Sequence, residues 1–423
     1  MASSQVSKEP VKNPYISRGA IQDPCHFFGR VQETREILDL TSGGQSVSIV
    51  GPRKIGKTSL LLHVRRSAPP VEAGKKTRHL YIFLDLQGKP QASQPEICQW
   101  MWNETLKTAG PVKRLPTAVE SAEEFEKAVR ELCAADFKLT LLVDEFELMA
   151  QNPQIDFNFL SRLCSLSTAQ LVNYVMTSRR PLSDLEYKDP FAYHSSFFTI
   201  FDQRHLGFLM PAEARELVCK PVQDMGFPDL TEEEVEFLFD LAGYHPACLQ
   251  IACYCLFEHK LTGQILDKQA KDEVRRKFKD RVGDYFHQIW KDLRRDEQEA
   301  MRLVAAGQTG RISDKLWDAL AHQCLVYEKS PFSSVFKEFV LQQGAVPDVG
   351  EKPGPPLSPP GSIAWPRSKK LAIVLEILIF LLVLMTLVGL TLAAVFKVPA
   401  LVYISFGLLI TIFILSLLRS LAV

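Results

Sequence analysis

The sequence lacks several features that would assign it to common functional classes. Its nine cysteines form no C-x-x-C pair and have no histidine partners at zinc-finger spacing. This pattern excludes a zinc finger and indicates reduced thiols in a cytosolic setting. The chain has no excess charge, with 49 basic and 49 acidic residues. Without the last 57 residues the balance is 44 basic against 48 acidic residues, which disfavours general binding to nucleic acid.

Three further absences narrow the function. No repeat at the periods of solenoids or propellers occurs, which excludes those architectures. No N-K-x-D motif for guanine is present, which favours ATP over GTP as a nucleotide. The first residues are polar and form no apolar leader, so we expect the folded part to stay inside the cell. What is present is 423 residues with 46% apolar and 23% charged content, enough for a folded protein of several domains.

Long apolar runs occur only near the end of the sequence. Residues 371–396 contain one charge, Glu376, and residues 398–418 contain none. Each run is long enough to cross the roughly 30 Å hydrocarbon layer, so we predict an antiparallel membrane hairpin; a buried core hairpin is the alternative. Basic residues flank the pair on both outer sides, against a lone Lys397 between the runs. The positive-inside rule then predicts a multi-pass protein of the cell (inner) membrane with both termini cytoplasmic.

Composition also predicts the domain boundaries. Residues 345–366 contain seven prolines and three glycines, which is typical of an extended, semi-rigid linker. The chain is therefore predicted to consist of a flexible tail, a nucleotide-binding core, a helical lid, a winged-helix-like module, this linker and two transmembrane helices. The predicted boundaries are 1–12, 13–209, 210–294, 295–344, 345–366 and 367–423.

Short apolar runs alternate with helical patterns in the first half of the chain. Five runs read as buried strands: 46–50, 79–86, 139–143, 171–176 and 197–201. Their alternation with helices predicts an α/β fold with a parallel sheet between helical layers. From about residue 210 the strand signals stop, and amphipathic helices are predicted at 212–219, 231–242, 247–259, 267–278 and 286–293. Residues 295–342 then predict a small helical module with a turn at 307–310 and a β-wing near 325–332.

The residues at 51–58 match the pattern G-x-x-x-x-G-K-[ST] between a predicted strand and a predicted helix. Such a loop wraps phosphate oxygens with backbone N–H groups at a helix N-terminus. Lys57 is expected to reach the β and γ phosphates, and Thr58 to offer its hydroxyl to Mg²⁺. The predicted nucleotide-binding set of this segment is Gly51, Pro52, Arg53, Lys54, Ile55, Gly56, Lys57, Thr58 and Ser59.

Two acidic residues end the apolar strand at 139–143. Asp144 suits Mg²⁺ coordination, and Glu145 is placed to activate the attacking water as a general base. Acidic residues at strand ends are also common as solvated caps, but their combination with the P-loop favours a catalytic role. The consecutive Asp-Glu favours ATP hydrolysis by an additional-strand P-loop ATPase over a kinase-type reaction.

A third polar group follows the strand at 171–176. The segment Thr177-Ser178-Arg179-Arg180 should emerge at the same carboxyl edge as Asp144, where Arg179 could sense the γ-phosphate. The alternative is an arginine pair that caps a surface loop.

These motifs together resemble those of STAND-type NTPases and their relatives, the archaeal and origin-recognition ATPases of the AAA+ group. The resemblance covers about residues 13–342 and rests on the order of Phe27-Phe28-Gly29-Arg30, the P-loop, Val143-Asp144-Glu145, Thr177-Ser178-Arg179 and Gly243-Tyr244-His245-Pro246. It implies a P-loop ASCE fold with a helical lid and a winged helix at 295–342. It further implies that Arg30 lies against the nucleotide, that Arg179 contacts the γ-phosphate and that Pro246 packs by bound ADP.

The predicted organisation differs from that of many STAND proteins after the winged helix. A linker and a membrane hairpin are predicted at the place where many of those proteins have a sensor array. The sensor is then missing or supplied by a partner protein in trans. We expect ATP or ADP with Mg²⁺ as ligands, and a membrane-anchored switch whose ATP form self-associates and clusters its hairpins in the bilayer, as in defence or cell-death switches. The alternative is a remodelling or DNA-tethering ATPase with the hairpin as a passive anchor. Six basic against seven acidic residues in 295–342 make DNA the less expected partner.

Overall fold

The computed structural model describes residues 11–16, 18–68, 77–112 and 115–344. The predicted linker and membrane hairpin, and most of the predicted N-terminal tail, lie outside these residues. In the part that is described, no helix is both long and apolar enough to cross a membrane. Residues up to Gly344 belong to one compact unit.

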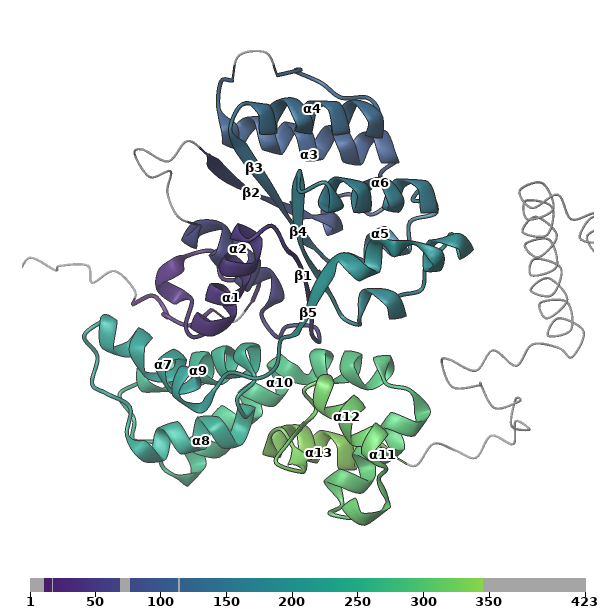
Figure 1. Ribbon diagram of the computed structural model, residues 1–423. Coiled ribbons are helices and arrows are strands. Elements are labelled where there is room, and N and C mark those ends of the chain that lie inside the picture. The colour runs from purple at the N-terminus through teal and green to yellow at the C-terminus, as the bar shows by residue number, and fades with distance from the viewer. Residues whose placement is uncertain (1–10, 17, 69–76, 113–114, 345–423) are drawn as a thin grey trace, which may run out of the picture. The chain divides into compact units, whose positions relative to one another are not determined.

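A five-stranded parallel sheet organises the first half of this unit (Figure 1). Its strands lie in the order β2-β3-β4-β1-β5, and every neighbouring pair is parallel. The P-loop follows β1 and Asp144 ends β3, and β4 lies between these two strands. This confirms the predicted additional-strand P-loop fold. The strands are β1 (Ser46–Val50), β2 (Arg78–Asp85), β3 (Phe137–Asp144), β4 (Val172–Ser178) and β5 (Phe201–His205).

Helices cover both faces of the sheet. Side chains of β1 such as Val47 and Ile49 pack with α1 and α2 on one face. Alternate residues of β2, β3 and β4 pack with α3, α4 and α6 on the other face. Both faces are therefore buried, which explains why these strands read as nearly continuous apolar runs. The helices are α1 (Val31–Ser42), α2 (Lys57–Ser67), α3 (Gln94–Ala109), α4 (Ala122–Ala134), the short α5 (Glu147–Ala150) and α6 (Phe157–Thr168).

One predicted strand was misplaced. Residues 197–201 were predicted as a strand, but Ser196–Ile200 forms a 3₁₀ turn and β5 begins at Phe201. Phe197 is fully buried against Phe146 and Tyr174, so its apolar character serves the core rather than a strand. The true strand lies at the edge of the sheet, where its Asp, Gln and Arg side chains remain partly or fully exposed.

The second half of the unit is helical, with one small hairpin. The lid contains α7 (Pro211–Asp224), α8 (Glu232–Ala242), α9 (Pro246–Lys260) and α10 (Lys268–Asp292). The module after it contains α11 (Arg295–Ala305), α12 (Asp314–His322), the antiparallel strands β6 (Val326–Tyr327) and β7 (Ser330–Pro331), and α13 (Ser334–Gln342). The hairpin lies within 325–332, where the sequence indicates a wing.

The lid also differs from expectation in one helix. Two separate helices were predicted at 267–278 and 286–293, but α10 is continuous over 25 residues. Its buried residues recur every three or four positions, at 270, 274, 278, 282, 285 and 286. That spacing forms a single buried face, so the packing supports one uninterrupted helix. Its last turns bring Tyr285 and Asp292 to the P-loop.

Candidate nucleotide-binding site

The P-loop has the backbone that a phosphate cradle requires. Gly56 precedes α2 with φ of 104°, and a Cβ placed there would meet no atom within 4 Å. Lys54 also has a positive φ of 61°, which is uncommon for a residue with a side chain and marks a constrained turn. The first N–H groups of α2 have no partners within the helix and are available to an anion.

Lys57 is the first residue of α2 and is only 5% exposed. Its Nζ donates to the carbonyl oxygens of Gly51, at 2.7 Å, and Pro52, at 3.0 Å. Burial lowers the pKa of Lys57, while the carboxylates of Glu147 and then Glu145 act against that shift. The ammonium group is thus held inside the loop among negative charges, as a phosphate-binding cation should be.

Asp144 lies at the carboxyl end of β3 and is 2% exposed. Its Oδ2 accepts a hydrogen bond from Thr58 Oγ1 at 2.6 Å, and its Oδ1 accepts one from Thr177 Oγ1. Burial raises the pKa of Asp144, and the two threonine hydroxyls oppose that effect. The structure therefore brings together Thr58 and Asp144, the two residues that the sequence assigns to Mg²⁺.

Glu145 adopts φ of 57°, a conformation that costs energy for a residue with a side chain and often occurs at functional sites. Its N–H donates to Thr177 Oγ1 at 3.1 Å. One carboxylate oxygen lies 3.6 Å from an Nη of Arg179. The predicted general base and the predicted γ-phosphate sensor are thus neighbours, one at the end of β3 and the other just after β4.

The lid helix α10 contacts the P-loop directly. Tyr285 Oη donates to the carbonyl oxygen of Arg53 at 2.9 Å and lies 2.9 Å from Nε2 of His245. His245 Nδ1 accepts the N–H of Cys248, so the proton of the neutral ring is on Nε2 and is donated to Tyr285. Lys54 Nζ lies 4.5 Å from the centroid of the Tyr285 ring. These contacts form a chain of hydrogen bonds from the start of α9 to the P-loop backbone.

Burial lowers the pKa of His245 to about 3, with the charges of Arg30 and Lys54 adding to the effect. The ring is therefore neutral at physiological pH and keeps its place in the chain of hydrogen bonds. Pro246 follows it as the first residue of α9. The predicted Pro246 thus lies one residue from a group that is linked to the P-loop.

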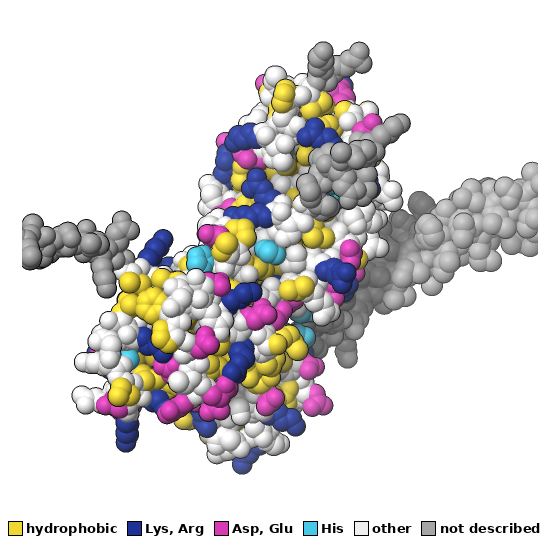
Figure 2. All heavy atoms as spheres, turned by 90° about the vertical axis from the view of Figure 1, so that its left-hand side faces the viewer, with side chains coloured by type: hydrophobic (Ala, Val, Ile, Leu, Met, Phe, Trp, Pro, Cys, Tyr) yellow, Lys and Arg dark blue, Asp and Glu magenta, His cyan; other side chains and the backbone are white. Residues whose placement is uncertain are grey.

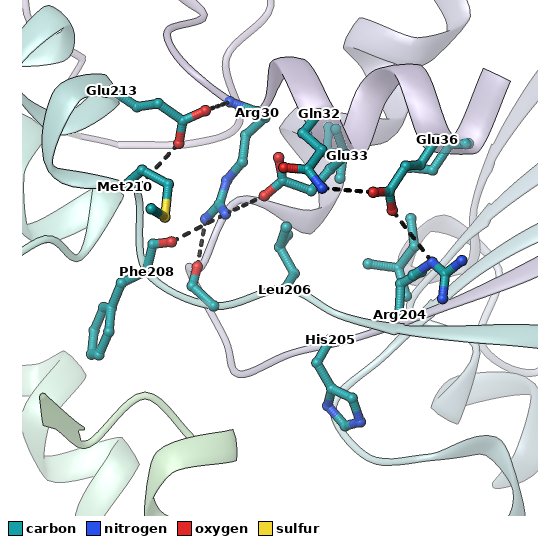
Figure 3. Close-up of a pocket in the computed structure, with 14 residues that line it drawn as sticks. Arg30, Gln32, Glu33, Glu36, Arg204, His205, Leu206, Phe208, Met210 and Glu213 are labelled. Atoms are coloured by element: carbon teal, nitrogen blue, oxygen red, sulfur yellow. Dashed lines mark hydrogen bonds and ion pairs between the residues drawn. The ribbon is translucent and has the colours of Figure 1, made fainter. Parts of the chain in front are cut away.

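Arg30, which the resemblance places against the nucleotide, is held by a set of contacts inside the protein. Its guanidinium donates to the carbonyl oxygens of Gly207, Phe208 and Ile55 and pairs with Glu33 at 2.8 Å. The side chain is buried and joins α1, the P-loop and the segment after β5. It lines a cavity of about 350 Å³ between α1 and that segment, and Figure 3 shows it extending from α1 toward Phe208.

Ser59 is hydrogen-bonded to the N-terminal segment, because its Oγ accepts the N–H of Ile21 at 3.0 Å. A few residues earlier, the N–H of Ile16 donates to Gln250 of α9 at 2.9 Å. The segment therefore runs from the lid to the helix that follows the P-loop. Arg53, which is about half exposed, approaches Asp292 at 3.8 Å.

Four residues near the site were not among the predicted ones. Thr177 could have been found from its place beside the predicted Arg179, and Glu147 from the Asp-Glu-Phe-Glu order at the end of β3. His245 lies inside the quoted Gly-Tyr-His-Pro segment. Tyr285 had no local signal, because only the fold brings α10 to the P-loop.

The donor set fits the expected ligands. A hydroxyl and a carboxylate at the start of α2 and the end of β3 are hard oxygen donors, which Mg²⁺ prefers when nucleotide phosphates complete its shell. Lys57 and the free N–H groups of the P-loop suit the phosphates themselves. The residues present therefore fit a nucleotide bound with Mg²⁺.

Solved structures of other proteins are similar to this chain. The Walker-type ATPase paby2304 of Pyrococcus abyssi matches with a TM-score of 0.51 at 14% identity, covering 76% of this chain and 98% of that chain. The Aeropyrum pernix ORC2 protein, in its ADPNP-ADP complexes, matches with a TM-score of 0.46 at 16% identity, covering 76% and 89%. The ADP form of that protein gives a TM-score of 0.44 at 17% identity, covering 73% and 82%. No curated protein matches the chain.

A family model gives a more specific result. The model of Novel STAND NTPase 2 matches residues 43–310, well over half of the chain. The match begins just before β1 and ends after α11, so it contains the P-loop, the Asp144 edge and the whole lid. The chain therefore belongs to the Novel STAND NTPase 2 family of P-loop NTPases.

Proposed function

We propose that this protein is an ATP-driven molecular switch that hydrolyses ATP slowly and that is anchored by the hairpin predicted at 371–396 and 398–418. Its ATP form self-associates and gathers several hairpins in one bilayer patch. The observation that carries the proposal is the hydrogen-bond chain from the P-loop through Tyr285 to His245. Through it, a change at the phosphates can alter the position of the lid.

The site supports hydrolysis by its own residues. Glu145 would accept a proton from the water that attacks the γ-phosphorus, as the bond to the ADP oxygen breaks. Lys57 and Arg179 would offset negative charge on the γ-phosphate. Thr58 and Asp144 would hold Mg²⁺, which when bound neutralises charge on the phosphate oxygens.

The lid supports the switch. In the structure α10 lies on the P-loop through Tyr285 and Lys54, with Arg53 near Asp292. A triphosphate that attracts Lys54 and displaces the Arg53 carbonyl would compete with these contacts. ADP lacks the γ-phosphate and therefore competes less with these contacts. It should favour the form in which the lid stays on the P-loop. The difference between the two nucleotides would therefore appear as a change of lid position.

The partners proposed here are the lipid bilayer, further copies of this chain and a sensor protein in trans. The first rests on the two apolar runs and the second on the membership of the family. DNA is not proposed as a partner. On the face that Figure 2 shows, Lys and Arg side chains are interspersed with Asp and Glu rather than gathered in a basic surface.

The test uses the full chain in detergent micelles. Particle size is followed by light scattering with ADP, with ATP, and with ATP in the Glu145→Gln variant, while phosphate release is recorded. We expect ATP to produce a discrete oligomer with slow phosphate release, and Glu145→Gln to make that oligomer persist. Lys57→Ala should abolish nucleotide binding, so particles of this variant should keep the size that the unaltered chain has with ADP.

Other outcomes contradict the proposal in different ways. Steady, rapid turnover without a change of size would favour the remodelling ATPase with a passive anchor. A chain that binds no nucleotide while Lys57 is present would refute the nucleotide switch itself. For the membrane role, vesicles that stay intact when Glu145→Gln is added with ATP would refute clustering of hairpins into a disruptive assembly.

A further inference from the structure

Glu147 is a buried carboxylate at the edge of the nucleotide site that the proposed reaction does not yet use. It is the first residue of α5, three positions after Asp144. Its side chain is only 8% exposed. A buried carboxylate is costly unless it is paired, so its presence in this place requires an explanation.

Its partner is Arg179. The Nε of Arg179 lies 2.9 Å from Glu147 Oε1. Among the described residues, neither oxygen of Glu147 has a hydrogen-bond partner of good geometry, and neither has the Nε of Arg179. A carboxylate that served only the fold would be expected to be surrounded by such donors. Glu147 instead forms an ion pair with the Arg179 guanidinium, next to the site.

The Glu147–Arg179 pair lies beside the residues that are expected to bind the nucleotide phosphates. Among the charges that act on Lys57, that of Glu147 has the largest effect on the pKa of the ammonium, ahead of Glu145 and Asp144. Burial raises the pKa of Glu147 itself, while Lys57 and Arg179 oppose the shift. Glu147 is therefore close to both cations that the nucleotide would use.

The geometry of Arg179 shows what the pairing can do. Its Nε forms an ion pair with Glu147, and one of its terminal nitrogens lies 3.6 Å from Glu145. The longer contact is the weaker of the two. A guanidinium that is ion-paired at Nε can exchange the partner of its terminal nitrogens without losing its place.

We propose that Glu147 is the positioning residue for Arg179 in ATP hydrolysis. The ion pair at Nε keeps Arg179 in place while its terminal nitrogens leave Glu145 for the γ-phosphate. The exchange has two effects: it brings positive charge to the γ-phosphate, and it frees the carboxylate of Glu145 to accept the proton from water. This inference rests on the proposed ATPase function and adds the residue that orients the sensor.

The experiment compares Glu147→Gln, Glu147→Asp, Arg179→Ala and the double variant Glu147→Gln with Arg179→Ala in the full chain. ATP affinity is measured with a fluorescent ATP analogue, hydrolysis by single-turnover phosphate release, and folding by thermal unfolding. Glu186→Gln is the matched control, because Glu186 is an exposed carboxylate on the loop after β4.

We expect Glu147→Gln to slow hydrolysis about tenfold or more, with ATP affinity changed by less than about threefold, since a misplaced group near the reacting atoms costs rate rather than binding. Glu147→Asp, which keeps the charge, should recover part of the rate. The double variant should be no slower than Arg179→Ala alone, because Glu147 acts through Arg179. Glu186→Gln should behave as the unaltered chain.

Three results would overturn the inference. They are an unchanged rate in Glu147→Gln, losses that multiply in the double variant, and a loss of ATP affinity that is the same with and without Arg179. If Glu147→Gln does not fold, Glu147→Asp replaces it. Its rate and ATP affinity are then compared with and without Arg179→Ala, and the same results overturn the inference. Failure of the proposed function looks different, because the unaltered chain would then neither bind nor hydrolyse ATP.

Discussion

Arg30 has both a role that the family resemblance implies and a set of contacts within the fold. The resemblance implies that it lies against the nucleotide, but its guanidinium is bonded to three carbonyl oxygens and Glu33. Its backbone N–H also donates to Glu213 at 2.7 Å, which ties the start of α1 to α7. In this structure Arg30 therefore joins elements of the fold.

We predict that Arg30→Lys lowers the free energy of unfolding by on the order of 2 kcal/mol, because an ammonium group cannot reproduce the planar set of donors. ATP affinity should change little. Urea unfolding and ATP titration of the full chain measure the two quantities. A loss of ATP affinity at unchanged stability would instead support the nucleotide contact that the resemblance implies.

At this scale the sequence predicted the residues whose chemistry a motif dictates. Lys57, Thr58, Asp144 and Glu145 can be assigned because phosphate and Mg²⁺ binding require these residue types at these positions. The structure brings Thr58 and Asp144 within hydrogen-bonding distance. Glu147 escaped the assignment because its role depends on where the side chain of Arg179 lies, which no local pattern specifies.

At the scale of an element, helix α10 is another feature that was not fully predicted from the sequence. Its spacing of apolar residues contains the information for one long buried face, yet the pattern was read as two shorter helices. The strands β1 to β4 were predicted well, because burial on both faces makes them continuous apolar runs. The edge strand β5 was not, because its exposed residues are polar and a more apolar segment precedes it.

The contact between α10 and the P-loop can be tested by removing the hydroxyl group of Tyr285. We predict that Tyr285→Phe lowers the free energy of unfolding by about 1–3 kcal/mol, because the Arg53 carbonyl and His245 Nε2 lose a buried partner. It should also speed the release of ADP, since the lid loses a bond to the loop. Stopped-flow release of a fluorescent ADP analogue measures the second effect.

The control for this prediction is Tyr327→Phe, in the small hairpin after the lid. The Tyr327 ring packs on the same aromatic cluster through Phe208 and Tyr244, but its hydroxyl is near solvent. That variant should release ADP at the rate of the unaltered chain. Equal rates for Tyr285→Phe and the unaltered chain would show that the hydroxyl does not hold the lid.

At the scale of the whole folded unit, the module after the lid is packed against the sheet and the lid. Cys324 is buried in the cluster that contains the core residues of α1 and α2. The His322 ring stacks on His205 of β5 at 4.5 Å between centroids. Gly243 has φ of 57°, and a Cβ there would lie 2.0 Å from the carbonyl oxygen of Phe332. The sequence indicates a module here, but not this docking, which depends on surfaces far apart in the chain.

Several histidines in different parts of this unit have a lowered pKa, and together they affect its stability in acid. Burial lowers the pKa of His79, in β2, to about 4 and that of His245, in the lid, to about 3. Burial also lowers the pKa of His205, with the charge of His322 as a smaller cause. Each of these groups binds its proton more weakly in the folded protein than at the ordinary value of 6.5. Below pH 6.5 the unfolded chain therefore takes up protons that the folded protein does not, and stability falls as the pH falls.

For His245 alone, this linkage predicts a loss of roughly 1.4 kcal/mol between pH 7.5 and 5.5, because the unfolded group gains about one proton over that interval. Urea unfolding of the full chain at pH 7.5, 6.5 and 5.5 should show the decline. His245→Asn keeps a capping side chain for α9, so its stability is expected to be lower at pH 7.5 but to fall less steeply with pH. His287→Asn, at an exposed position on α10, should leave the steepness unchanged. If His245→Asn and the unaltered chain lose stability in parallel, His245 takes up its proton in the folded state, and the neutral link between the lid and the P-loop is wrong.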